Sequence, residues 1–314
     1  MNLQMICQQY VAFRRTLGDR FVVNGNQLKA FCRAMGPEID IADVSPEKVN
    51  VFLVGDGPLT TTWYVKHNAL RGFYRYAISR GFVKTSPLPL TIPKLPPFKP
   101  YIYSPAELRR ILDSTEACPR RRLSDLDASV MRVLIFLMYG AALRTSEVLS
   151  LTVRDVDLAD AVLTIRNSKF FKSRLVPLGP NTVRVLAEYS RRHDSRSRKP
   201  DDPFFVDRNS KQIPLHKLER AFKHIRKYAG LHRDGGPRCQ PRLHDLRHTS
   251  AVHRLTSWYR EGKDVQKLLP QLSVYMGHTL LAATQVYLSM TPNLLHQASL
   301  RFERYAKWEG SSND

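Results

Sequence analysis

The chain has 314 residues, enough for one large domain or two ordinary ones, and 43% of them are hydrophobic, which excludes a globally disordered protein. Lys and Arg number 49 against 28 Asp and Glu, so the net charge is 49 − 28 = +21. A charge of this size, spread along a globular pattern, predicts a polyanionic partner, and nucleic acid is the first choice.

The N-terminal part, residues 1–83, is predicted to be helical. An apolar stripe with helical spacing is formed by Ile6, Tyr10, Phe13 and Leu17. Ser45 followed by Pro46 is typical of a helix start, and Gly81 is typical of a helix stop. The helix before Gly81 places three basic residues away from its apolar face: Lys66, Arg71 and Arg75. That face is either the solvated side of a plain bundle or a surface that lies on DNA phosphates.

Residues 84–103 are predicted to be a stiff, extended linker, because six prolines between 87 and 100 forbid a regular helix or a central strand. Residues 104–314 combine helices with a short β region. Ser104 begins a helix, the apolar run 133–143 predicts a buried helix too short to cross a bilayer, and a break is expected near Gly140. Two strands, 162–166 and 174–178, are joined by a lysine-bearing turn.

Neither a disulfide framework nor a zinc knuckle is expected, because the four cysteines are far apart in the sequence and form no C-x-x-C pair. This cysteine usage favours a reducing cytoplasm. The N-terminus lacks the basic-then-apolar order of a signal peptide, and no membrane partner is expected.

Four short motifs in the C-terminal part carry the candidate functional residues. They supply Arg144 and Glu147, then Lys169, Lys172 and Arg174, then His244, Arg247 and His248, and finally His278 and Tyr287. Taken singly, each motif has a structural explanation, such as an i,i+3 ion pair, solvated turn lysines or a core tyrosine. A metal site is a rival interpretation for His244 and His248, which have ligand spacing, but Asp245 stands where zinc proteases carry glutamate and no third ligand is apparent.

Taken together, the four motifs supply what phosphodiester chemistry without a metal or nucleotide cofactor requires. Two arginines can hold the charge on the non-bridging phosphate oxygens. A tyrosine can attack phosphorus, and a cationic pocket is expected to favour its phenolate. A lysine can protonate the departing 5′ oxygen, and histidines can donate hydrogen bonds or move protons near neutral pH.

The set R-x-x-E, a hairpin lysine before "RLVPLG", H-x-L-R and G-H-x8-Y resembles the tyrosine recombinase (phage integrase) family, with matching order and spacing from about Ser104 to Glu309. The segment "SMTPNLLHQASLRFE" resembles the transposon-borne branch. The resemblance implies a mostly α fold with a small β-sheet (α+β). It also implies a C-shaped clamp around duplex DNA, built from a helical core-binding domain and a catalytic domain.

The resemblance also implies roles for single residues. Tyr287 is the nucleophile that forms a 3′-phosphotyrosyl bond, Arg144 and Arg247 hold the phosphate, and Glu147 supports the site. The remaining catalytic positions are His244, His278 and Lys169. Lys172 stays an alternative general acid, because Ser168 and Phe170 flank Lys169 where the family often has glycine. DNA contacts are expected from Lys66, Arg71, Arg75, Lys172 and Arg174, and His248 is left without a role.

The function expected from these observations is site-specific cleavage and rejoining of double-stranded DNA, with no cofactor, in the service of a transposon or phage. The expected assembly is a homo-tetramer on DNA, with related recombinases as alternative partners, at the bacterial nucleoid. Type IB topoisomerase activity and a non-catalytic DNA-binding regulator are the alternatives. A terminal apolar stripe, formed by Leu294, Ala298, Phe302 and Tyr305, packs either on its own domain or, as the resemblance implies, on a neighbouring protomer.

Overall fold

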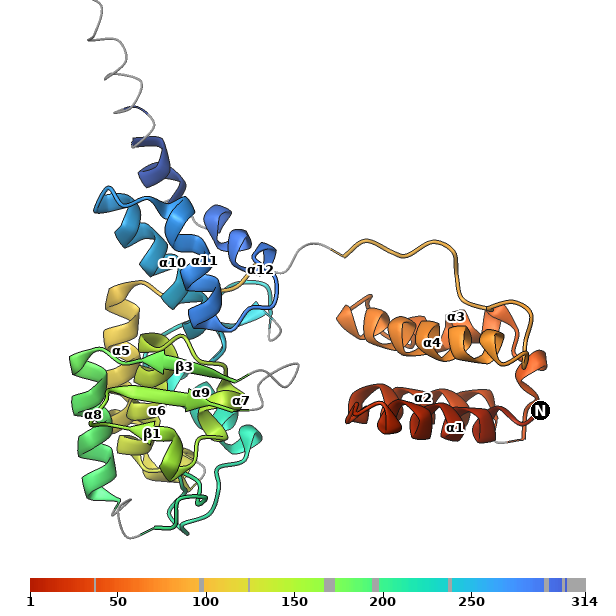
Figure 1. Cartoon of the computed structure of the whole chain (residues 1–314), viewed down its shortest axis with the longest axis horizontal. Helices are drawn as coiled ribbons and strands as arrows, with labels where there is room; N and C mark the ends of the chain where they lie inside the picture. Colours follow the sequence, from red (N-terminus) through yellow and green to blue (C-terminus); the bar gives the residue numbers. More distant parts are fainter. Residues whose placement is uncertain are drawn as a thin grey trace, which may run out of the picture. The chain divides into compact units, whose positions relative to one another are not determined.

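The computed structural model describes residues 1–314 apart from 37, 96–98, 124, 167–172, 194–197, 237–238, 291–293, 301–302 and 304–314. It consists of two compact units, Met1–Phe98 and Lys99–Asp314, and the division falls within the proline-rich segment 84–103 (Figure 1). The fold is mostly helical with one small sheet, so the predicted fold class is confirmed. Among the described residues, no helix combines the length and the apolar character that a bilayer crossing requires.

The N-terminal unit is a bundle of helices. Its helices are α1 (Leu3–Thr16), α2 (Val22–Met35), α3 (Pro46–Val54) and α4 (Thr61–Ser79), with a short 3-10 turn at Ile41–Asp43. Ser45 caps α3 through its hydroxyl, and Pro46 occupies the first helical position, as predicted. Gly81 follows the end of α4 with φ +74°, a conformation that suits glycine.

The predicted apolar stripe of α1 is only partly correct. Ile6 and Tyr10 are buried in the bundle, but Phe13 is 38% exposed and Leu17 is 63% exposed. Leu17 lies beyond the last helical residue, Thr16, so the helical spacing no longer places it over the core. On α4, by contrast, the apolar face from which the three basic residues were expected to point away is formed by Leu70, Phe73 and Ala77 and is fully buried.

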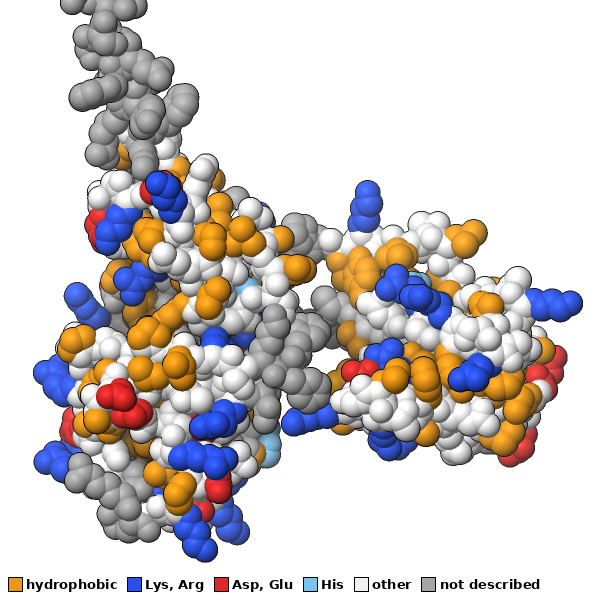
Figure 2. All heavy atoms as spheres, in the orientation of Figure 1, with side chains coloured by type: hydrophobic (Ala, Val, Ile, Leu, Met, Phe, Trp, Pro, Cys, Tyr) orange, Lys and Arg blue, Asp and Glu red, His pale blue; other side chains and the backbone are white. Residues whose placement is uncertain are grey.

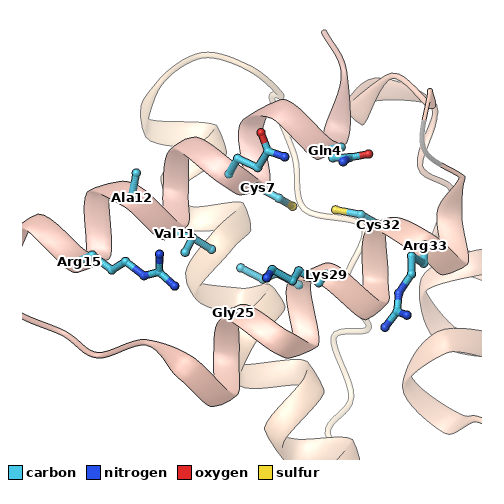
Figure 3. A pocket seen from close by; sticks show the side chains of 11 residues that line it. Gln4, Cys7, Val11, Ala12, Arg15, Gly25, Lys29, Cys32 and Arg33 are labelled. Carbon is cyan, nitrogen blue, oxygen red and sulfur yellow. The ribbon is translucent and has the colours of Figure 1, made fainter.

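Two cysteines that are distant in the sequence meet in this unit. Cys7 on α1 and Cys32 on α2 are buried free thiols that lie close together. Figure 3 shows their sulfur atoms facing each other beside a groove between the two helices, which Arg15, Lys29 and Arg33 also line. Their proximity comes from the packing of α1 against α2 and could not be predicted from their spacing.

The C-terminal unit holds the other elements. In chain order these are α5 (Pro105–Ala117), a 3-10 turn (Arg120–Arg122), α6 (Ala128–Gly140), α7 (Thr145–Leu149), a 3-10 turn (Val153–Asp155), β1 (Val156–Asp157), β2 (Val162–Ile165), β3 (Arg174–Pro177), α8 (Pro180–Arg192), α9 (Leu215–Tyr228), α10 (Asp245–Arg260), α11 (Val265–Met276), α12 (Ala282–Gln285) and a 3-10 turn (Val286–Ser289). Ser104 and Glu107 form a capping box at the start of α5. The predicted buried helix is α6, which ends at Gly140.

The sheet is a three-stranded antiparallel meander in the order β1-β2-β3. Strands β2 and β3 match the two predicted strands to within one residue, with Leu163 opposite Val176 and Ile165 opposite Arg174. The two-residue strand β1 was not predicted. Leu163, Ile165 and Val176 are buried and join the main core of the unit, so the sheet fixes where Arg174 leaves the hairpin.

A second, smaller core packs α10 and α11 against the last elements. Its members include Val252 and Leu255 on α10, Met276 on α11, Tyr287 and Leu294. The start of the predicted terminal stripe, Leu294, is thus buried within its own unit. Of the rest of that stripe, Phe302 and Tyr305 lie outside the described residues.

Candidate active site

The catalytic residues predicted from the first, third and fourth motifs converge in the C-terminal unit. Arg144 precedes α7, and His244 and Arg247 lie at the start of α10. His278 follows α11, and Tyr287 lies in the last 3-10 turn. Hydrogen bonds link these segments across up to 133 positions of sequence, so the grouping is created by tertiary packing.

Glu147 is the centre of an ionic network. Its carboxylate, 4% exposed, accepts hydrogen bonds from Arg144 Nη1 at 2.7 Å and from Arg174 Nη1 and Nη2 at 3.0 and 2.9 Å. Arg247 Nη1 lies 4.0 Å from the same carboxylate. Burial opposes its ionisation, but the hydrogen bonds and charges of Arg174 and Arg144 outweigh burial and lower the pKa of Glu147 to about 2. The carboxylate therefore holds the arginines in place as a fixed anion.

Arg247 is buried to an unusual degree for a cation, at 1% exposure. Its guanidinium donates hydrogen bonds to the carbonyl oxygens of Ala142 at 2.5 Å and Met276 at 2.6 Å. Burial, together with the charge of Arg144, lowers its pKa to about 10, which leaves it a cation at neutral pH. A charge buried at this cost, with neutral carbonyls as its main partners, is typical of a site that receives an anion.

Two backbone positions shape this cluster. Ala142 has φ +50°, which is uncommon for a residue other than glycine, and in that conformation its carbonyl accepts from Arg247. Gly277 has φ +67°, and a Cβ there would lie 2.6 Å from Nη1 of Arg174. Its carbonyl accepts from Arg144 Nη2 at 2.9 Å. The glycine of the G-H motif is thus required both by its backbone conformation and by the guanidinium packed against it.

Tyr287 is 3% exposed, and its hydroxyl lies 3.0 Å from Nδ1 of His248. Its ring stacks on that of His278, with 6.1 Å between centroids and an interplanar angle of 25°. The sequence predicts that the cationic pocket favours the phenolate, but the structure shows the opposite balance. Burial raises the pKa of Tyr287 more than the charges of Arg247 and Arg144 lower it. The tyrosine therefore rests as a phenol and needs a proton acceptor.

The three histidines of the site are held as neutral rings. Burial, then the charge of Arg247, lowers the pKa of both His244 and His278, and that of His278 reaches about 4. His278 Nδ1 lies 2.7 Å from the hydroxyl of the buried Thr284. The rings of His244 and His248 meet edge to face at 5.1 Å, an arrangement of two side chains one helical turn apart.

The structure places the other predicted site residues in different surroundings. Lys169 and Lys172 lie outside the described residues. Arg174 was predicted to contact DNA, but its side chain is 10% exposed and is held by Glu147 and by the carbonyl of Tyr275, 3.0 Å from its Nε. Arg71 and Arg75 are exposed on α4, whereas the ammonium of Lys66 donates to the carbonyl of Phe52 at 2.6 Å.

Sequence reasoning missed two contributors, His248 and the buried role of Arg174. A signal for His248 was present, since it follows His244 by one helical turn and must share its face of α10. No local signal indicates that Arg174 reaches a carboxylate 27 positions earlier. For the rival metal interpretation, the described residues contain no group of three or more His, Cys, Asp or Glu side chains that could hold an ion.

A basic groove adjoins the cluster. It is lined by residues of α9 and of the segment before α10, and it reaches Thr145 and His244. Its cationic side chains are Lys223, Arg226, Lys227 and Arg242. Lys223, Lys227 and Arg242 are exposed, and Figure 2 shows further Lys and Arg side chains on the visible faces of both units. The groove leads to His244, and its positive charge suits a strongly anionic ligand.

Comparison with known proteins agrees with this geometry. The phage integrase family matches residues 103–293. A putative integrase/recombinase of Sinorhizobium fredii, y4rE, is 33% identical over 94% of this chain and 94% of its own length. The tyrosine recombinase XerD of Pseudomonas putida is 28% identical over 73% of this chain and 71% of its own length.

Two solved structures share the fold. A lambda integrase dimer bound to a COC′ core site matches with a TM-score of 0.71 and 17% identity, over 93% of this chain and 97% of that chain. The Tn1549 transposon integrase in complex with transposon right end DNA gives 0.67 and 18%, over 98% and 100%. The chain therefore belongs to the phage integrase family and is a tyrosine recombinase, an enzyme that cleaves and rejoins DNA.

Proposed function

We propose that this recombinase joins specific DNA sites of a mobile element through a 3′-phosphotyrosyl intermediate formed by Tyr287. The observation that carries the proposal is the position of the Tyr287 hydroxyl. Tyr287 is buried, its ring stacks on that of His278, and its hydroxyl is subject to the charges of Arg247 and Arg144. The ring of Tyr287 packs in the small core around α10, which holds the hydroxyl beside two arginines, where a phenol can attack a phosphodiester.

Arg144 and Arg247 bind the non-bridging oxygens of the scissile phosphate in this proposal. Their planar guanidinium groups match the charge that develops on those oxygens, and Glu147 fixes their orientation before DNA arrives. The neutral rings of His278 and His244 lie next to the bound phosphate in this proposal. Each ring donates a hydrogen bond to the phosphate from its N–H group. Lys169 protonates the departing 5′ oxygen, with Lys172 as the alternative donor.

Because the cations of the site are side chains, we expect cleavage to persist in excess chelator. The covalent bond to tyrosine conserves the energy of the phosphodiester, so rejoining needs no nucleotide. Loss of cleavage in chelator, with recovery on addition of zinc or magnesium, would revive the interpretation of His244 and His248 as metal ligands.

Duplex DNA contacts both units in this proposal. Lys223, Lys227 and Arg242 line the groove that leads to His244 and are suited to the phosphate backbone. Arg71 and Arg75 supply exposed positive charge on α4. A tetramer on two paired sites is the proposed assembly, since a lambda integrase tetramer bound to a Holliday junction matches this chain with a TM-score of 0.66.

The experiment that tests the proposal is covalent capture. The full chain is incubated with a library of labelled, nicked duplexes of randomised sequence, in which cleavage releases a short strand and prevents rejoining. Adducts that survive denaturation are isolated, and their DNA is sequenced to define the target. We expect wild-type adducts to map to Tyr287 by peptide mass, and Tyr287→Phe to form none while still binding the selected duplex.

Tyr275→Phe is the matched control. Tyr275 lies near the same cluster and contributes its backbone carbonyl to Arg174, an interaction that phenylalanine preserves. We expect this variant to form adducts like the wild type. An adduct that persists in Tyr287→Phe and disappears in Tyr275→Phe would reassign the nucleophile. Absence of any adduct with the wild type would remove the catalytic proposal altogether.

A further inference from the structure

His248 occupies a position at the nucleophile that the proposed mechanism leaves unused. It lies on α10 one turn after His244, and its Nδ1 is 3.0 Å from the Tyr287 hydroxyl. The two rings are tilted by 55° with centroids 5.6 Å apart, so they meet through the nitrogen and the oxygen and are not stacked. A titratable nitrogen at this distance from the attacking atom invites a chemical role.

The partners of the hydroxyl decide the direction of this hydrogen bond. Arg247 acts on the Tyr287 hydroxyl by lowering its pKa, but a guanidinium has no lone pair to offer and cannot accept the phenolic proton. The single proton of the hydroxyl is therefore donated elsewhere. Nδ1 of His248 is the acceptor that the described residues provide at hydrogen-bonding distance from that hydroxyl. This arrangement requires the tautomer of His248 with its proton on Nε2.

The state of His248 fits an acceptor. Burial, then the charge of His244, lowers its pKa to about 4, so the ring is neutral at neutral pH, and in the tautomer with its proton on Nε2 the Nδ1 atom carries a free lone pair. The other two histidines are less suited to the task. Nδ1 of His278 is hydrogen-bonded to the Thr284 hydroxyl, and its ring lies roughly parallel to that of Tyr287 with 6.1 Å between centroids. His244 contacts the ring of His248 edge to face at 5.1 Å between centroids, and among the described residues no hydrogen bond joins His244 to the Tyr287 hydroxyl.

We propose that His248 is a catalytic residue that accepts the proton of Tyr287 as its oxygen attacks the scissile phosphate. In this step the bond between the tyrosine oxygen and phosphorus forms, and the bond between phosphorus and the 5′ oxygen breaks. The phenolic proton moves to Nδ1 of His248, and the 5′ oxygen takes a separate proton from the general acid. Rejoining reverses both transfers, and His248 returns its proton to Tyr287. The inference rests on the proposed function, because it assumes Tyr287 as nucleophile.

Single-turnover adduct formation on the duplex selected by covalent capture tests this role. His248→Asn places an amide oxygen near the position of Nδ1, which accepts a hydrogen bond but does not take up the proton. We expect it to slow cleavage by about 100-fold, the lower end for general acid–base catalysis. His253→Asn is the matched control, since His253 lies on the same helix and its Nδ1 is 2.9 Å from the hydroxyl of Tyr139, outside the cluster. It should cleave at the wild-type rate.

A duplex with sulfur in place of the scissile 5′ oxygen separates the two proton transfers. The departing thiolate needs no proton, so a defect in the general acid disappears on this substrate. The His248→Asn defect should remain, because nucleophile activation is still required. Full rescue by the sulfur substrate, or wild-type rates for His248→Asn on the normal duplex, would assign His248 another role.

Histidine analogues at position 248 keep the test decisive if the asparagine variant does not fold. Nδ1-methylhistidine retains the ring but blocks the proposed acceptor, whereas Nε2-methylhistidine leaves it free. We expect only the Nδ1-methyl chain to lose cleavage, and equal activity of the two chains would overturn the inference. Failure of the wild-type chain to form a Tyr287 adduct would instead refute the proposed function, so the two failures are distinguishable.

Discussion

The two units place their positive charge in opposite ways. In the N-terminal unit, Arg71 and Arg75 are exposed on α4, where water solvates them. In the C-terminal unit, Arg247 is 1% exposed and Arg174 is tied to a buried carboxylate. Removing a guanidinium from water costs free energy, whereas an exposed arginine keeps its hydration. Exposed cations therefore indicate affinity for a polyanion, and buried cations indicate a reaction centre.

The hydrophobic cores of the two units also differ in the kinds of side chain that they contain. The N-terminal core is built from aromatic and aliphatic contacts such as Tyr10 with Phe73 and Phe31 with Tyr74, which stabilise the bundle. The small core around α10 includes Tyr287, whose ring lies against His248 and His278 and whose hydroxyl is subject to the charge of Arg247. A fold that needed only stability would not concentrate ionisable groups there.

The largest effect expected from this contrast concerns Arg247 and Arg71. Arg247→Ala should slow adduct formation by about 100- to 1,000-fold, by analogy with the loss of one donor to a developing oxyanion. Arg71→Ala should leave the rate at saturating DNA unchanged, because an exposed cation contributes to binding alone. Rates are measured in single turnovers, with thermal unfolding of each variant as the folding control. Equal rates for the two variants would break the distinction between buried and exposed cations.

Glu147 provides a pH-dependent test of stability. Its pKa is lowered to about 2 from an ordinary value of 4.5, so its ionised form stabilises the fold above pH 4.5 and that contribution is lost as the pH falls toward 2. The shift corresponds to about 3 kcal/mol at neutral pH. Glu147→Gln should therefore be destabilised by about that amount at pH 7, and the difference from the wild type should shrink below pH 4.

Denaturant unfolding at several pH values measures this difference. Glu188→Gln is the matched control, because Glu188 forms an exposed pair with Arg192 that is worth little. A Glu147→Gln deficit that stays constant from pH 7 to about pH 3 would show that packing, and not ionisation, is responsible.

Gly81 and Gly277 have similar backbone conformations, so they allow the two units to be compared at single positions. Gly81 has φ +74° and open space around its Cα, whereas Gly277 has φ +67° and the guanidinium of Arg174 where a Cβ would lie. Gly81→Ala should cost about 1–2 kcal/mol from the left-handed conformation alone. Gly277→Ala should cost about 1–3 kcal/mol more and should also impair cleavage, because Arg174 and Glu147 must shift. Unfolding and adduct assays check both; equal losses at the two positions would contradict the close packing.

Much of this site could be predicted from the sequence because the chemistry is local to short motifs. The spacing of Arg144 and Glu147 gives an i,i+3 pair, and the pattern of 162–166 and 174–178 gives a hairpin. The roles of Arg174 and His248 depend on which distant segment packs against them, and no periodicity encodes that. The protonation of Tyr287 was mispredicted for a related reason. Charge is visible in a sequence, but the burial that outweighs it is created only by the fold.

The smallest expected effect concerns salt. Each phosphate that is no longer paired with a cation should reduce the slope of log K against log salt by about 0.9. Changing both Arg71 and Arg75 to Ala should therefore lower the slope by about 2 if both exposed cations bind phosphates, without changing cleavage at saturation. Binding is measured over a range of KCl with a random-sequence duplex and with Tyr287→Phe as the parent chain, so that no adduct forms.

Lys66 allows the effect of an engaged cation on the salt dependence of binding to be compared with that of exposed cations on the same helix. It shares α4 with Arg71 and Arg75, but its ammonium donates to the carbonyl of Phe52 and lies 4.6 Å from the centre of the Phe52 ring. Since those interactions already engage the cation, Lys66→Ala should change the salt slope less than Arg71→Ala and should destabilise the bundle more. A larger slope change at Lys66 would show that DNA recruits the lysine away from Phe52, and that exposure in the free chain does not identify the residues that bind phosphate.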